Sequence, residues 1–79
     1  MNPRVIRVNP LENFQLKLTF SNGEVGLFDA KPYLEKGIFK ELKNPELFNE
    51  VNTSLGSIAW KSGQDLCPDT LYLESKIFK

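Results

Sequence analysis

The stretch that decides the fold is Phe14-Gln15-Leu16-Lys17-Leu18-Thr19-Phe20-Ser21-Asn22-Gly23-Glu24-Val25-Gly26-Leu27-Phe28-Asp29. From Phe14 to Phe20, large apolar side chains alternate with polar ones. Successive side chains of a strand point to opposite faces, so this alternation predicts a strand with one buried and one solvated face. Asn22-Gly23 is the pair most favoured in a type I′ hairpin turn, where both residues need a positive φ. Because residues 25–29 turn apolar again, we predict a β-hairpin over residues 14–29.

The segments on either side of the hairpin also have β character. Residues 4–8 are rich in β-branched side chains and predict a first strand. Residues 9–13 predict a turn, with Pro10 placed where its missing N–H stops strand pairing. Further along, residues 53–60 return to β character, with Gly56-Ser57 as a turn or bulge. The chain therefore predicts strands before and after the hairpin.

Between these β segments the chain predicts short helical pieces. Asp29 is placed to cap a turn over residues 31–34, which Gly37 would end. Residues 38–42 indicate a second short helix. In Asn44-Pro45-Glu46 the asparagine suits the N-cap, the proline the first helical position and the carboxylate the first turn. Each piece is so short that packing, rather than helix propensity, must hold it.

The C-terminal part predicts a turn at residues 61–64 and a last helical turn that begins at Pro68. Hairpins rather than long crossover connections favour an antiparallel sheet with helices grouped beside it. We therefore predict an α+β fold: a small antiparallel sheet built on a central β-hairpin, with short helices packed on one face. The chain has 79 residues, which fits a single domain over residues 1–79.

Composition excludes several classes of function. The chain has no histidine and one cysteine, so neither a Ser-His-Asp nor a Cys-His arrangement can form, and no Cys/His metal cage either. Its glycines are scattered, which speaks against a phosphate-binding loop. Ten basic residues balance ten acidic ones without a basic stripe, so we expect no autonomous nucleic-acid binding. We expect no enzyme activity, cofactor, metal or membrane segment, and a cytoplasmic location.

Three weaker chemical readings have structural alternatives. Asp65 and Asp69 lie on either side of Pro68 and could hold Mg²⁺ or Ca²⁺, but acidic groups more often complement a helix start. Cys67 could be a reactive thiol at a helix N-terminus, or a small buried or half-buried apolar residue. The aromatic residues, Trp60 among them, could stack bases, but their alternation places most of them in a core. The structural reading is favoured in each case.

The segment from Ile58 to Tyr72 resembles the bacterial domain of unknown function 2442 family. Members of that family end in a Trp, then a Gly, Asp-Leu, Pro-Asp and Leu-Tyr, in this order and spacing. The matching residues here are Trp60, Gly63, Asp65, Leu66, Pro68, Asp69, Leu71 and Tyr72. The front half shares Phe20-Ser21-Asn22-Gly23-Glu24, Asp29, Gly37-Ile38-Phe39-Lys40-Glu41-Leu42 and Phe48-Asn49-Glu50-Val51. The chain departs from the family at Lys61-Ser62 and Cys67, which affects the detail of the turn.

The resemblance implies an α+β domain with no established enzymatic activity. Members occur alone or fused to a helix-turn-helix, and often neighbour another small protein in an arrangement like a toxin–antitoxin pair. We expect no helix-turn-helix within these residues, so we carry no DNA binding over. Together with the missing catalytic groups, this favours a protein-protein interaction module that binds a partner or itself, as the antitoxin-like member of such a pair. The alternative is an accessory or ligand-sensing domain related to transcription regulators. We expect the segment from Trp60 to Tyr72 to close the fold structurally.

Overall fold

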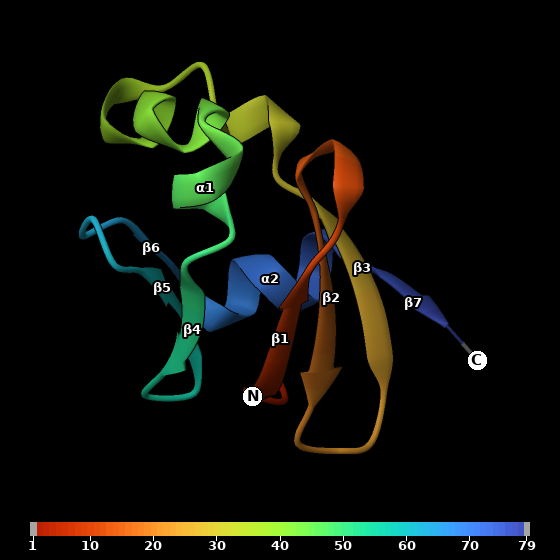
Figure 1. Ribbon diagram of the computed structural model, residues 1–79. Coiled ribbons are helices and arrows are strands. Elements are labelled where there is room, and N and C mark those ends of the chain that lie inside the picture. The colour runs from red at the N-terminus through yellow and green to blue at the C-terminus, as the bar shows by residue number, and fades with distance from the viewer. Residues whose placement is uncertain (1, 79) are drawn as a thin grey trace.

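The computed structural model describes residues 2–78 and contains two antiparallel sheets (Figure 1). The first has four strands in the order β1-β2-β3-β7, and the second has three in the order β4-β5-β6. The strands are β1 (Val5–Pro10), β2 (Gln15–Phe20), β3 (Val25–Asp29), β4 (Val51–Ser54), β5 (Ser57–Trp60), β6 (Asp65–Leu66) and β7 (Lys76–Phe78). The helices are η1 (Glu12–Phe14), η2 (Lys31–Tyr33), η3 (Gly37–Lys43), α1 (Pro45–Phe48) and α2 (Pro68–Glu74), where η marks a 3₁₀ helix. The predicted α+β class is confirmed.

The predicted hairpin is formed by β2 and β3 at the centre of the first sheet, but its turn is not type I′. Thr19 pairs with Val25, and the Phe20 N–H donates to the Glu24 carbonyl at 2.8 Å, which leaves a three-residue loop. Gly23 has a φ of 89°, whereas Asn22 keeps a negative φ. The Asn22 side-chain oxygen accepts the Glu24 N–H at 3.0 Å and thereby holds this conformation. The loop is a type I turn followed by a glycine bulge.

Pro10 was expected to lie in a turn, but it is the last residue of β1 and pairs with Leu16. A proline cannot donate a ladder hydrogen bond, so it is tolerated in an edge strand. β1 is such a strand, because only β2 flanks it within the first sheet. The turn that follows is therefore shorter than predicted and begins at Leu11.

Asp29 and Asn44 make the side-chain hydrogen bonds that were predicted, Asp29 before η2 and Asn44 at the N-cap of α1. Asp29 Oδ1 accepts the Lys31 N–H at 3.0 Å, and Asn44 Oδ1 accepts the Glu46 N–H at 3.1 Å. Between them the chain is mostly 3₁₀-helical, and α1 spans only Pro45–Phe48. No helix within residues 2–78 is both long and apolar enough to cross a membrane.

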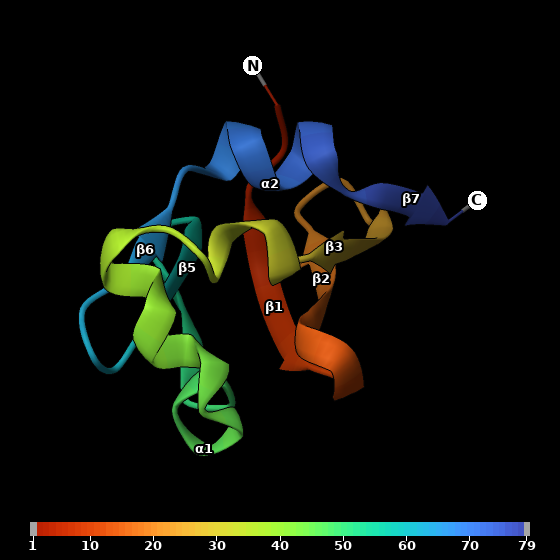
Figure 2. The same ribbon diagram turned by 90° about the horizontal axis from the view of Figure 1, so that it is seen from above.

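Both sheets and the helices contribute to one core. Helix α2 lies across both sheets (Figure 2) and contacts one strand of each, β3 and β5. Its buried apolar residues are Val5, Leu16, Leu18, Phe20, Phe28, Ala30, Leu34, Leu42, Phe48, Val51, Ile58, Trp60 and Leu71. A continuous row of aromatic rings crosses it, with neighbouring centroids 5.2 to 6.2 Å apart: Phe14, Phe48, Trp60, Phe39, Tyr33 and Phe28. The row joins the central hairpin to the second sheet and the helical segment.

Candidate functional site

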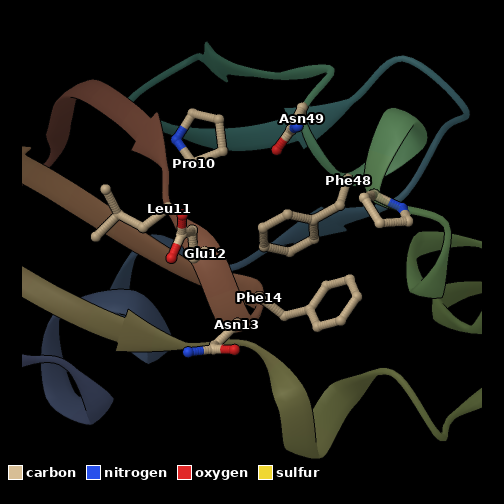
Figure 3. A pocket seen from close by; sticks show the side chains of 8 residues that line it. Pro10, Leu11, Glu12, Asn13, Phe14, Phe48 and Asn49 are labelled. Carbon is tan, nitrogen blue, oxygen red and sulfur yellow. The ribbon is translucent and has the colours of Figure 1, made fainter.

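A groove of about 570 Å³ lies between the loop that joins β1 to β2 and helix α1 (Figure 3). Its lining residues are Pro10, Leu11, Glu12, Asn13, Phe14, Pro45, Phe48 and Asn49. The rings of Phe14 and Phe48 meet edge to face there, with centroids 5.2 Å apart and planes at 84°. Phe48 is buried and Phe14 half-buried, while Leu11 is 41% exposed. The groove therefore has an aromatic floor, of which the Phe14 ring, together with Leu11 beside it, is accessible to an apolar group from outside.

The backbone of the loop is strained beside this floor. Asn13 and Phe14 have φ values of 61° and 59°, both in the left-handed region. Asparagine tolerates that conformation, but for a bulky side chain such as phenylalanine it costs roughly 1–2 kcal/mol. The Phe14 carbonyl accepts the Ala30 N–H at 3.0 Å, which holds the residue in place. Such strain marks candidate functional positions, because a fold keeps it only where its surroundings enforce it.

The electrostatics of the groove are simple. Glu12 is the one charged side chain among the lining residues, and it forms no ion pair within residues 2–78. Asn13 and Asn49 add neutral polar groups to the rim. With one carboxylate and no base beside it, the groove suits binding better than acid–base chemistry. An apolar group that carries a positive charge next to it would match this lining.

A second surface feature is the tip of the β4–β5 hairpin. Ser54 pairs with Ser57, so Leu55 and Gly56 form a two-residue turn, with φ values of 51° and 82°. These values indicate a type I′ turn, whose first position normally holds Asn, Asp or Gly. Here that position is occupied by Leu55, which is 95% exposed. Arg4 lies across the turn, and its Nη1 donates to the Leu55 carbonyl at 3.2 Å. We call Arg4, Leu55 and Gly56 the Leu55 tip.

The segment from Trp60 to Tyr72 is distributed over β5, β6 and α2. Trp60 Nε1 donates to the Phe48 carbonyl at 2.9 Å, inside the core. The Trp60 N–H donates to the Gln64 carbonyl at 2.8 Å, and the Gly63 N–H to the Trp60 carbonyl at 2.9 Å. Gly63 has a φ of 109°, which only glycine adopts readily. This part of the segment is a tight turn that seats the tryptophan.

Gln64, which the sequence placed in a turn, is 1% exposed. Its Nε2 donates to the Ile38 carbonyl at 2.7 Å, and its Oε1 accepts from the Ser62 hydroxyl at 2.5 Å. The side chain thus ties helix η3 to the β5–β6 turn. No local pattern signals this role, because the partner carbonyl lies far away in the sequence.

The structure separates the roles of the two aspartates. Asp65 is exposed in β6, whereas Asp69 lies in the first turn of α2, and its Oδ1 accepts a hydrogen bond from Asn2 Nδ2 at 3.3 Å. Cys67 was expected to be a buried or half-buried apolar residue, but this is wrong: it is exposed at the N-cap of α2, where its thiol makes no capping hydrogen bond. Within residues 2–78, no group of three or more His, Cys, Asp or Glu residues could hold a metal ion.

The remaining residues of the segment anchor α2. Leu66 is half-buried in β6, and Pro68 opens the helix as predicted. Leu71 is buried in the core. The Tyr72 hydroxyl donates to Glu24 Oε1 at 2.6 Å, and its ring meets Phe20 edge to face. That hydrogen bond, aided by burial, raises the pKa of Tyr72 above its ordinary value.

Comparison with known protein families identifies the family of this chain. Residues 5–76 match the model of a protein family of unknown function, DUF2442, which spans the structure from the start of β1 to the start of β7. The chain belongs to this family. The DUF2442 match includes the groove, Leu55 and Gly56 of the tip, and the segment from Trp60 to Tyr72, whereas Arg4 lies just before it. No curated protein and no solved structure matches the chain.

Proposed function

We propose that this DUF2442 protein is a non-enzymatic protein-protein interaction module of the bacterial cytoplasm. Leu55 carries the proposal. A single exposed leucine is ordinary on a protein surface. This one also occupies a left-handed position that favours other residue types, and its side chain lies outside the core. A residue whose backbone conformation is unfavourable for its type, and whose apolar side chain is exposed, supports a role in contact with another molecule.

The groove is a second surface that supports the same proposal. It is lined by apolar and neutral residues with one carboxylate, Glu12, so it can recognise a protruding side chain by shape and charge. A strained loop positions its floor, and that strain is most simply maintained for binding. The chain thus carries both an exposed apolar tip and a groove for an apolar group.

We propose the product of the neighbouring gene as a partner, with this chain as the antitoxin-like member of the pair. This step uses the gene arrangement that the family resemblance implies. The test is co-expression of both proteins, followed by size-exclusion chromatography of the mixture and of each protein alone. We expect either a joint peak or self-association of this chain. A strict monomer that does not co-elute with its neighbour would contradict the proposal.

A ligand-sensing domain is the second candidate, and the volume of the groove favours it. About 570 Å³ falls within the range of roughly 300–1,000 Å³ of small-molecule sites. A thermal-shift screen tests this role, since a ligand that binds only the native state raises the melting temperature. The shift should disappear in a Leu11→Ser variant, because Leu11 lines the groove. A screen without stabilising compounds would count against sensing.

A further inference from the structure

We infer that copies of this chain associate head to tail, with the Leu55 tip of one copy in the groove of the next. The inference rests on the proposed interaction function and names one interface and one partner for it, a second copy of this chain. Three observations carry it: the shapes of the two surfaces, their charges, and their placement at opposite ends of the same strands.

The apolar parts of the two surfaces match. The tip presents an aliphatic side chain that is 95% exposed, at the turn of a narrow hairpin. The groove presents the half-buried ring of Phe14, which packs on the buried ring of Phe48, with Leu11 at its edge (Figure 3). A leucine side chain seated on the Phe14 ring would leave water together with the exposed part of Leu11. The tip thus supplies an anchor and the groove its pocket, which is the usual arrangement at the centre of an interface.

The charges match as well. Arg4 lies across the tip, so the exposed leucine has a guanidinium beside it. Glu12 is the charged member of the groove lining. Within residues 2–78, neither Arg4 nor Glu12 takes part in an ion pair, so both charges are available to a second molecule. The chain carries ten basic and ten acidic residues, so its copies have no net charge with which to repel each other.

The placement of the two surfaces prevents a chain from filling its own groove. β1 begins at the tip, where the Val5 N–H donates to the Gly56 carbonyl at 2.9 Å, and it ends at Pro10 in the groove. The ends of a strand of this length lie about 17–20 Å apart. Figure 1 shows the β4–β5 turn and the β1–β2 loop at opposite ends of the molecule. The contact therefore joins two different patches, which produces rings or open chains rather than a symmetric dimer.

The association should be weak and concentration-dependent. One leucine anchor and one ion pair bury much less than the roughly 1,000 Å² of a stable interface. We therefore expect a dissociation constant on the order of 0.1–1 mM. Such an interface becomes populated at high local concentration, and a partner that presents a similar tip would compete for the same groove.

The test is sedimentation velocity of the full chain from micromolar to millimolar concentration. Leu55→Asn removes the anchor but keeps a residue that suits the turn. Leu73→Asn is the matched control, because Leu73 is a 70% exposed leucine on α2 that belongs to neither the tip nor the groove lining. Glu12→Arg reverses the charge in the groove. We expect Leu55→Asn and Glu12→Arg each to raise the dissociation constant at least tenfold, as the loss of a hot-spot residue does. Leu73→Asn should leave it unchanged.

Mixing the two defective variants is decisive. The Leu55→Asn chain keeps a working groove and the Glu12→Arg chain keeps a working tip, so their mixture should recover a one-to-one dimer that cannot grow further. A mixture that stays monomeric, or a Glu12→Arg chain that associates like the parent, would overturn the inference. If the parent chain is monomeric at millimolar concentration but co-elutes with its neighbour, this inference fails while the interaction function stands. If neither association is seen, both fail.

Discussion

Asparagine at position 55 should raise the free energy of unfolding, even though it replaces an apolar residue by a polar one. Leu55 has a φ of 51° in a type I′ turn, at a cost of roughly 1–2 kcal/mol for a residue of this kind. Asparagine followed by glycine is the pair that this turn favours, so about half of that cost should be recovered. Nothing is lost in burial, because the leucine side chain is 95% exposed when folded. We expect a gain of about 0.5–1 kcal/mol.

For a domain of this size, 1 kcal/mol corresponds to roughly 4–8 °C in melting temperature. The gain should therefore appear as an increase of about 2–8 °C in a melt followed by circular dichroism. Urea unfolding should show a higher midpoint with the same slope, since the exposed surface does not change. The Leu73→Asn control should show no gain, because Leu73 lies in helix α2, where asparagine has the lower helix propensity.

A loss of 0.5 kcal/mol or more in Leu55→Asn would refute this reasoning. It would mean that the leucine side chain stabilises the fold through a contact, and the argument for a binding role would lose its basis. A gain in stability together with weaker association would instead show that the chain keeps a less stable turn for the sake of its contact with other molecules.

Three further changes test other parts of the structure. Gln64→Ala should cost about 1–3 kcal/mol, because it leaves the Ile38 carbonyl without its donor, and hydrogen exchange should accelerate first in η3. Burial and the hydrogen bond to Glu74 raise the pKa of Tyr33 to about 12. Its contribution to stability is therefore fully present below pH 10 and lost as the pH rises towards 12, and Tyr33→Phe should flatten this part of an alkaline unfolding profile. Gly26→Ala should cost about 1–3 kcal/mol, since its new Cβ would lie 3.0 Å from Ile77 Cδ1, and limited proteolysis should then release β7 more easily.

The parts of the fold that follow from neighbouring residues could be predicted. The β2–β3 hairpin followed from alternation, and the hydrogen bonds of Asp29 and Asn44 followed from residue type and position. The turn type was wrong because the Asn22 side chain binds the Glu24 N–H, a choice that the Asn-Gly pair alone does not determine. Pro10 was misplaced because its tolerance in β1 depends on that strand lying at a sheet edge.

The parts that depend on distant partners could not be predicted. β7 has three residues and exists as a strand because Ile77 pairs with Gly26, far away in the sequence. The groove brings residues 10–14 together with residues 45–49, and its floor depends on a left-handed Phe14 that no sequence signal indicates. The segment from Trp60 to Tyr72 could be located in advance, but the buried position of Gln64 became visible only with η3 in place.

The position of Trp60 gives this protein an internal optical probe. It is the one tryptophan of the chain, and its ring stands between Phe48 and Phe39 in the aromatic row. Its indole N–H donates to the carbonyl of Phe48, the same residue whose ring forms the floor of the groove. An occupant that shifts Phe48 therefore alters the surroundings of the indole directly. The emission of the unlabelled protein can thus follow the filling of the groove, at wavelengths where tyrosine and phenylalanine contribute little.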